Sequence, residues 1–342
     1  MTAPRRRASA DVPNAVRTLP ACRRTRPHRV RPRPCVDASE ELEVTMTRPP
    51  DDQRPIVVGI DPDPAKRTAL AWAADEAARR GVPLRLVHAE GVPTPGYEVP
   101  SWQEWNQALH EAGERVLKDA VAFAETRQPR VEVSGLLAEG SPAWVLGEQS
   151  RGATAVVLGS QHLGRLEEAF GSASIAVPVL AHTRCPVVVV PEPERIDRRS
   201  AYYVVGVDGS PQAAAAVDVA FAEAALRGAA LRALHVWQPG PLRIIDEQEA
   251  QREWSRILSE AVAGRGTAYR GVEVHQEVVV GHPVQALTEA SADALGLVVG
   301  TRGHGGFTGM LVGSVSQGVL RHARCPVIAV PQPPERGPRE RP

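Results

Sequence analysis

The chain contains the same α/β module twice, and this internal repeat constrains its fold more than any other feature. Residues 204–208, Val-Val-Gly-Val-Asp, match residues 57–61, Val-Val-Gly-Ile-Asp, and the match continues into the next helix and strand. Both copies end in Arg-Cys-Pro-Val, at 184–187 and 324–327. A repeat of this length indicates tandem copies of one structural unit. We therefore predict two similar domains, and the differences between them become evidence about function.

Composition and charge set the outer boundaries of these domains. Residues 1–36 carry ten arginines and one acidic residue, Asp11, with little periodic apolar pattern. Such a segment buries too little apolar surface to fold, so residues 1–54 are predicted to be a disordered Arg/Pro-rich tail. Two interpretations stay open, a translation start nearer Met46 and a basic arm for anionic surfaces. The first domain then covers 55–191 and the second 202–331.

The periodicity predicts alternating strands and helices in both domains. Short apolar runs rich in β-branched residues predict strands at 56–60, 84–89, 131–137, 155–159, 186–190, 203–208, 231–237, 272–280, 295–300 and 326–330. Amphipathic stretches predict helices at 65–80, 103–126, 142–150, 172–182, 211–227, 246–263, 283–292 and 314–323. This order requires right-handed crossovers. The predicted fold class is therefore α/β, with two tandem doubly wound parallel sheets.

A glycine-rich loop follows the fourth predicted strand of the second domain. Gly300, Gly303, Gly313 and Ser314 spell Gly-x2-Gly-x9-Gly-Ser, and a predicted helix follows directly. Ligands of open parallel sheets bind beyond the carboxyl ends of the strands. Glycines let the backbone approach a ligand, and the free N–H groups of a helix start hold anionic oxygens. The loop is therefore typical of a phosphate-binding site.

This string, Asp208 at the end of the first strand and the Cys-Pro-Val entry to the last strand together resemble the universal stress protein family in its tandem form. The resemblance implies a Rossmann-like five-stranded sheet of order 3-2-1-4-5 in each domain, and ATP as ligand, often with a divalent cation such as Mg²⁺. It also implies where ATP would bind. The adenine–ribose end would meet Asp208 and Val236. The middle of the ligand would meet Val299, Gly300 and Gly303. The phosphates would meet Gly313, Ser314, Val315 and Ser316.

The first domain departs from this pattern. Its loop is one residue shorter and contains Glu167 and Glu168, whose carboxylates would repel phosphates. Pro62 and Asp63 stand where the second domain has Gly209 and Ser210, and Pro178 is expected to kink or end the helix after the loop. We therefore expect weaker ATP binding in this domain, through Asp61, Gly159, Gly171, Ser172 and Ser174.

Two other classes of nucleotide-binding protein are excluded, because their motifs are not found at the required positions. A Rossmann dehydrogenase needs its glycines after the first strand, and a P-loop NTPase needs a lysine in its loop, whereas Lys66 and Lys118 lie outside any glycine loop. The sequence predicts no catalytic residue and no metal ligand, since His88 and His235 lack a recognisable partner. We expect a nucleotide-dependent sensor or regulator rather than an enzyme. A slow ATPase and a nucleotide-independent dimerising scaffold remain alternatives.

The expected partners follow from the same considerations. No apolar run approaches the roughly 18 residues of a membrane span, and nucleic acid is not an expected partner. A signal peptide is not predicted, so the expected location is the cytoplasm. The family resemblance implies pairing of the two domains through their last strands; homodimers and a regulatory protein of unknown identity stay open. Cys185 and Cys325 would then approach a pseudo-twofold axis, without forming a disulfide.

Overall fold

The structure is a computed structural model, which describes residues 54–91, 102–160, 175–191, 201–238, 247–303 and 312–332. Almost all of the predicted tail lies outside these ranges, and so do Gly171, Ser172, Ser174, Glu167 and Glu168.

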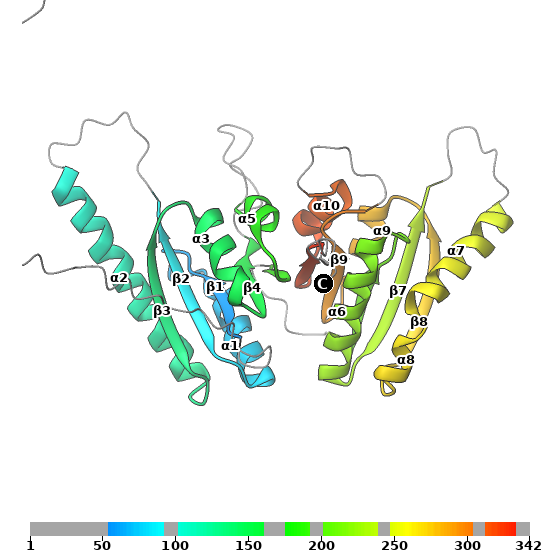
Figure 1. Ribbon diagram of the computed structural model, residues 1–342, viewed down its shortest axis with the longest axis horizontal. Coiled ribbons are helices and arrows are strands. Elements are labelled where there is room, and N and C mark those ends of the chain that lie inside the picture. Colours follow the sequence, from blue (N-terminus) through cyan, green and yellow to red (C-terminus); the bar gives the residue numbers. More distant parts are fainter. Residues whose placement is uncertain are drawn as a thin grey trace, which may run out of the picture. The chain divides into compact units, whose positions relative to one another are not determined.

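The first module alternates strands and helices as the sequence predicts (Figure 1). Its strands are β1 (Ile56–Gly59), β2 (Leu84–Glu90), β3 (Val133–Glu139), β4 (Ala155–Gly159) and β5 (Val187–Val190). Its helices are α1 (Thr68–Arg80), α2 (Trp102–Arg127), α3 (Pro142–Gln149) and α5 (Ala176–His182), with a short 3₁₀ turn η2 (Ser150–Gly152).

The second module repeats this order of elements (Figure 1). Its strands are β6 (Tyr202–Gly206), β7 (Ala230–Trp237), β8 (Val274–Val280), β9 (Gly296–Gly300) and β10 (Val327–Val330). Its helices are α6 (Pro211–Arg227), α7 (Glu247–Val262), α8 (Arg265–Ala268), α9 (Pro283–Ala290) and α10 (Ser314–His322). The α/β fold class with two tandem parallel five-stranded units is thus confirmed.

The strands join in the order β3-β2-β1-β4-β5-β10-β9-β6-β7-β8. Every pair within a module is parallel, whereas β5 and β10 are antiparallel, with Val188 opposite Ile328. The intramolecular pairing through the last strands is therefore present. Within each module, the second and third strands lie on one side of the first strand, and the fourth strand lies on its other side. The carboxyl ends of β1 and β4, and of β6 and β9, consequently border a topological switch point, where doubly wound sheets bind ligands.

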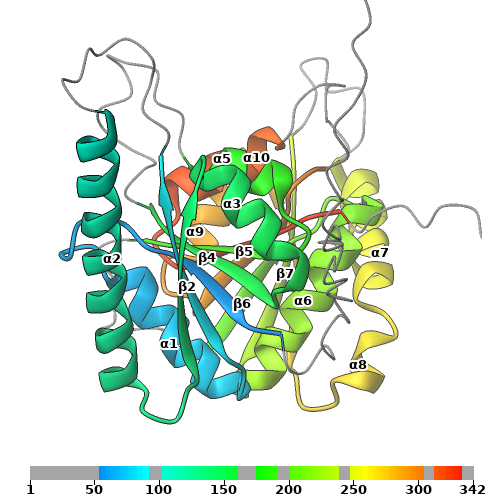
Figure 2. The ribbon, with the colours of Figure 1, turned by 60° about the vertical axis from the view of Figure 1, so that its left-hand side comes forward.

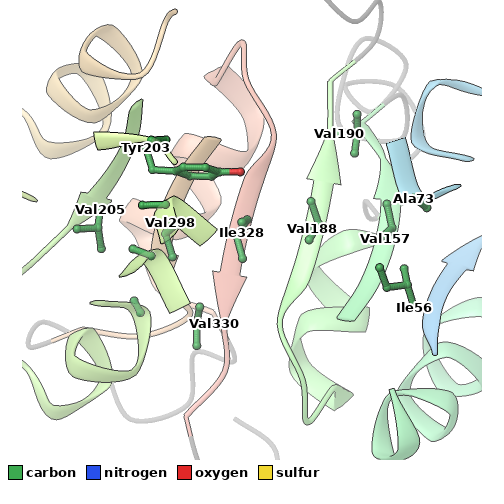
Figure 3. Packing of buried hydrophobic residues seen from close by; sticks show 14 of the residues in the cluster. Ile56, Ala73, Val157, Val188, Val190, Tyr203, Val205, Val298, Ile328 and Val330 are labelled. Carbon is green, nitrogen blue, oxygen red and sulfur yellow. The ribbon is translucent and has the colours of Figure 1, made fainter. Parts of the chain in front are cut away.

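Apolar side chains cover both faces of the sheet. One core cluster joins the strands to α1, α2, α6 and α7, and the other joins them to α3, α5, α9 and α10 (Figure 2). Figure 3 shows the first cluster, with Val188 of β5 and Ile328 of β10 on neighbouring strands and Tyr203 on β6. Because the first cluster includes residues of both modules, the two modules share one continuous apolar layer.

The first helix of each module ends in the same way but begins differently. Gly81 and Gly228, with φ of 65° and 59°, follow α1 and α6 in the left-handed conformation that favours glycine. α6 begins at Pro211, where the Ser210 side chain accepts a hydrogen bond from Ala213 N at 3.1 Å. α1 begins only at Thr68, three residues later than predicted. Pro62 and Asp63 replace the residues that start α6, so α1 lacks this serine cap.

The expectation for Pro178 is wrong. Pro178 lies in the first turn of α5, and the helix continues to His182. A proline is tolerated there because the first N–H groups of a helix have no partner within the helix.

The expectation that the two cysteines approach a twofold axis is also wrong. The β5–β10 register is centred near Val188 and Ile328, and each cysteine precedes its strand centre by three residues. Because the strands are antiparallel, Cys185 and Cys325 lie at opposite ends of the ladder, roughly 20 Å apart. A disulfide cannot join side chains at that separation. Burial also raises the pKa of the Cys185 thiol to about 12, which makes it a poor nucleophile.

Candidate functional site

The end of β6 and the end of β9 bring Asp208 and Gly303 together at the switch point of the second module. Asp208 follows β6, and its Oδ1 accepts a hydrogen bond from Ser210 N at 2.9 Å. A Cβ at Gly303 would lie 2.0 Å from Oδ2 of Asp208. This distance is far below any contact that a carbon atom can make, so glycine is required for the observed approach. Two residues that lie 95 positions apart in the sequence are thus in contact.

The start of α10 is fastened to the end of β9. Gly313 N donates to Thr301 O at 2.8 Å, and the buried Ser316 Oγ donates to Gly300 O at 2.6 Å. Ser316 therefore uses its single hydroxyl proton to position the helix, so only its backbone N–H could bind an anion. Ser314 is exposed at the first position of α10. The predicted residues Gly300, Gly313, Ser314, Val315 and Ser316 accordingly form one strand-end and helix-start unit.

The end of β7 contributes Val236 and His235 on opposite faces of the sheet. Val236 packs against the cluster that includes Val299, whereas His235 faces α7, where its ring stacks on Trp254 at a centroid distance of 4.0 Å. His235 Nδ1 lies 2.7 Å from the carbonyl oxygen of Val207 and must donate to it, so Nε2 carries the lone pair in the neutral ring. In the described part of the chain, Nε2 is buried without a hydrogen-bond partner. Burial and stacking on Trp254 thus give this histidine a packing role.

The stability of the fold should depend on the ionisation of His235. Burial lowers its pKa below 6.5, and neither the Val207 carbonyl nor Asp208 fully offsets this. The unfolded chain then binds more protons, so the stabilising contribution is present above about pH 6.5 and is lost as the pH falls towards the folded-state pKa. We expect the free energy of unfolding to fall by at most about 1.4 kcal/mol per pH unit in this window. Urea unfolding at several pH values measures it.

A matched pair of variants identifies the group that causes this pH dependence. His235→Gln should remove it, whereas His275→Gln should keep it, because His275 is exposed at the β8 edge. An identical pH profile in the His235→Gln variant would show that another group is responsible.

The corresponding strand end of the first module carries an ion pair. Asp61 Oδ1 accepts from Asp63 N at 2.8 Å, and Lys66 Nζ lies 3.3 Å from Asp61 Oδ2. Lys66 occupies this position because α1 begins late; the equivalent residue in the second module, Ala213, is already within α6. Lys66 was not predicted as a site residue, because only cations inside glycine loops were considered. The Pro-Asp-Pro segment at 62–64 was the signal that could have revealed it.

The first module also encloses a cavity of about 730 Å³ at its strand ends. Asp61 and Gly159, both predicted as weaker site residues, line it together with side chains from α1, α2, α3 and α5. The sequence favoured the second module as the principal site, yet this cavity lies in the first. Small-molecule sites commonly occupy cavities of this size with mostly apolar walls. The first module is therefore a candidate site in its own right.

Within the described ranges, no group of three or more His, Cys, Asp or Glu side chains is placed to hold a metal ion. A magnesium ion held mainly by phosphate oxygens needs only one or two protein carboxylates, which Asp208 could supply. Within the same ranges, no helix has the length and apolar character needed to cross a membrane.

Fold and strand-end geometry define a tandem doubly wound α/β protein with a glycine-lined switch point. The chain belongs to the universal stress protein family, a stress-response family, because the model of that family matches residues 53–191 and 203–331.

Relatives in this family cover most of the chain. Universal stress proteins Rv2005c and Rv2623 of Mycobacterium tuberculosis are each 35% identical to it, over 83% and 80% of this chain and 99% and 95% of their own lengths. The crystal structure of a universal stress protein from Archaeoglobus fulgidus is 19% identical, with a TM-score of 0.64, and covers 82% of this chain and 97% of its own. The likeness to that structure supports the fold alone.

Proposed function

We propose that this chain is an ATP-binding universal stress protein that acts as a nucleotide-dependent sensor or regulator in a stress response. The observation that carries the proposal is the contact between Asp208 and Gly303 at the switch point. It brings a carboxylate that can accept sugar hydroxyl groups beside a glycine backbone that a ligand can approach closely. The start of α10, with Gly313, Ser314, Val315 and Ser316, supplies N–H groups for the phosphates.

Binding rather than catalysis is proposed for this site. His235 lies close enough to Asp208 for their charges to interact, but it is buried and covered by Trp254. A general base must reach the proton that it removes, and this ring does not meet that requirement. Slow hydrolysis is measured directly by phosphate release. A turnover in the usual enzyme range of about 1 s⁻¹ or more would contradict the proposal.

The proposal also includes a cytoplasmic location and a regulatory protein partner. The location is proposed because no signal peptide is predicted. The partner follows from the role as a sensor, because a change of nucleotide state needs a macromolecule to report it to. A nucleotide-independent scaffold is the competing function, and it predicts the same partners with and without ATP.

Calorimetric titration with ATP and Mg²⁺ tests the nucleotide site. Asp208→Ala should weaken binding by about 10- to 100-fold, because a hydrogen bond to a charged group contributes about 1.5–3 kcal/mol. Glu277→Ala is the matched control. Glu277 of β8 pairs with Arg232 of β7, away from the Asp208–Gly303 contact. Equal ATP affinity in the unaltered chain and in Asp208→Ala would refute the assignment. No ATP binding by the unaltered chain would favour the scaffold.

A further inference from the structure

Strand β3 lies at one edge of the sheet, with a neighbour on only one side among the described strands (Figure 1). Hydrogen bonds at its two ends show which of its residues face that neighbour, β2. Glu132 O accepts from Leu84 N at 2.8 Å, and Gly140 N donates to Glu90 O at 3.1 Å. Peptide groups alternate in direction along a strand, so the even-numbered residues face β2. The odd-numbered residues of β3 therefore direct their N–H and C=O groups away from the sheet, where a further strand could pair with them.

The side chains of β3 do little to prevent such pairing. From Val133 to Ala138 the strand has no charged residue and no proline, and Gly135 at its centre is exposed. Edge strands are commonly protected from association by charges, prolines or bulges. The corresponding edge strand of the second module, β8, does carry a charge, since Glu277 pairs with Arg232. The first module therefore presents the more permissive of these two edges.

The two ends of β3 carry groups of complementary chemistry. Arg130 precedes the strand and Glu139 ends it, and both are exposed. Trp144 of α3 lies beside the same end as Glu139, because a Cβ at Gly140 would be 3.6 Å from Trp144 Cε3. Trp144 is nevertheless 57% exposed. Tryptophan and arginine are enriched among the residues that contribute most to protein–protein affinity.

These features belong to the first module alone. Without gaps, residues 130–144 align with 271–285, and the two stretches share Val-Glu-Val, a glycine and a proline. The second module has glycine in place of Arg130, glutamine in place of Gly135 and glutamine in place of Trp144. The three differences fall on one edge strand and its two ends, which indicates an interface specific to that edge.

We propose that two copies of this chain form a dimer by pairing their β3 strands antiparallel, with Gly135 opposite the partner's Gly135. This direction brings Arg130 to the strand end that carries the partner's Glu139 and the partner's Trp144. Parallel pairing in register would instead place Arg130 beside an identical cation. A twofold interface of this kind is closed, so association stops at the dimer. The inference does not depend on nucleotide binding, and its failure would leave the proposed function untouched.

Sedimentation equilibrium of the full chain at micromolar concentrations tests the dimer. In the proposed register, Val133 N–H donates to the partner's Leu137 O. Val133→Pro removes this donor from both copies but no β2–β3 hydrogen bond, and proline is tolerated at the first residue of an edge strand. The dissociation constant of the dimer should rise at least about tenfold.

Val274→Pro is the matched control on the other edge. Val274 begins β8 as Val133 begins β3. Its N–H also points away from the sheet, because the preceding residue, Glu273, faces β7 and accepts from Leu231 N at 2.8 Å. This variant should leave the dissociation constant within about twofold. Matching far-ultraviolet circular dichroism shows that both variants are folded.

Charge reversal tests the direction of pairing. Arg130→Glu should weaken the dimer about tenfold, because it places a carboxylate near the partner's Glu139 at both ends of the interface. Adding Glu139→Arg to the same chain should restore the dissociation constant to within about twofold, since each end then has opposite charges again. Trp144→Gln, which introduces the residue of the second module, should weaken the dimer at least about tenfold.

Three outcomes would overturn this inference. The first is a chain that stays monomeric throughout the micromolar range, which would leave the β3 edge to another occupant. The second is a dimer that Val133→Pro leaves unchanged or that Val274→Pro weakens equally. The third is a dimer weakened by Arg130→Glu that Glu139→Arg does not restore, because antiparallel pairing requires these two positions to meet.

Discussion

Replacing Glu76 with alanine should lower the free energy of unfolding by about 3–5 kcal/mol, although Glu76 lies outside both candidate sites. Glu76 of α1 is 1% exposed and accepts hydrogen bonds from Arg79 and Arg80, each at 2.6 Å, and from Arg227 of α6. Glu223 of α6 accepts from Arg227 at 2.7 Å and from Arg80. Removing one carboxylate leaves partly buried guanidinium groups without their counter-charge.

The charges form a ring that repeats across the two modules. Glu76 and Arg80 are four residues apart, as are Glu223 and Arg227, and both pairs are separated by the same 147 positions of the repeat. Glu223→Ala should therefore cost about as much as Glu76→Ala. The double variant should lose less than the sum of the two, because both substitutions remove members of one network.

Urea unfolding measures these free energies, with Arg256→Ala as the control. Arg256 pairs with Glu253 and Glu260 along α7, but all three side chains are exposed, so its removal should cause no measurable change. A loss below about 1 kcal/mol for Glu76→Ala would mean that the ring behaves as an exposed ion pair.

The sequence predicted the elements of the fold well because the repeat and the apolar runs report the same strands. Asp208 and Gly303 were also predicted to share one site, and their contact follows from the positions of β6 and β9 in the sheet. The strands are signalled locally by their apolar runs, whereas the strand order and the shared site were implied by the family resemblance. Residues that a fold brings together through its strand order can be predicted once that order is correctly inferred.

The charge ring and the cysteine positions could not be predicted in this way. Glu76 and Arg80 look like an ordinary solvated pair on a helix, because only the pairing of β5 with β10 brings Glu223 and Arg227 beside them. The cysteines were misplaced because their separation depends on the register of that same pairing. The cavity was not predicted because it depends on side-chain volumes at lining positions such as Ala112, which a sequence motif does not report.

The second prediction of large effect concerns this pairing of β5 and β10. Ile328→Asp should destabilise the chain by about 4–7 kcal/mol at neutral pH, since burial raises a carboxyl pKa by up to about 3–5 units at about 1.4 kcal/mol each. Ile328 is 2% exposed, opposite Val188 in the ladder and within the apolar cluster that both modules share (Figure 3). The described members of that cluster are all uncharged.

The pH dependence distinguishes this electrostatic effect from a loss of packing. The new carboxyl would have a folded-state pKa above its unfolded value of about 3.9, so the folded state would bind more protons. The electrostatic part of the destabilisation should be full above the raised pKa, shrink as the pH falls through it, and vanish near pH 4, while the loss of packing remains. Ile328→Asn loses the same packing without ionising, so its stability deficit should not show this recovery. Urea unfolding of both variants at pH 8 and pH 5 measures the difference, and equal deficits at the two pH values in Ile328→Asp would show that position 328 is open to water.

Because β5 and β10 join the modules into one sheet and one apolar layer, we expect each variant to unfold in a single transition. Separate transitions for the two modules would show that the ladder does not couple them.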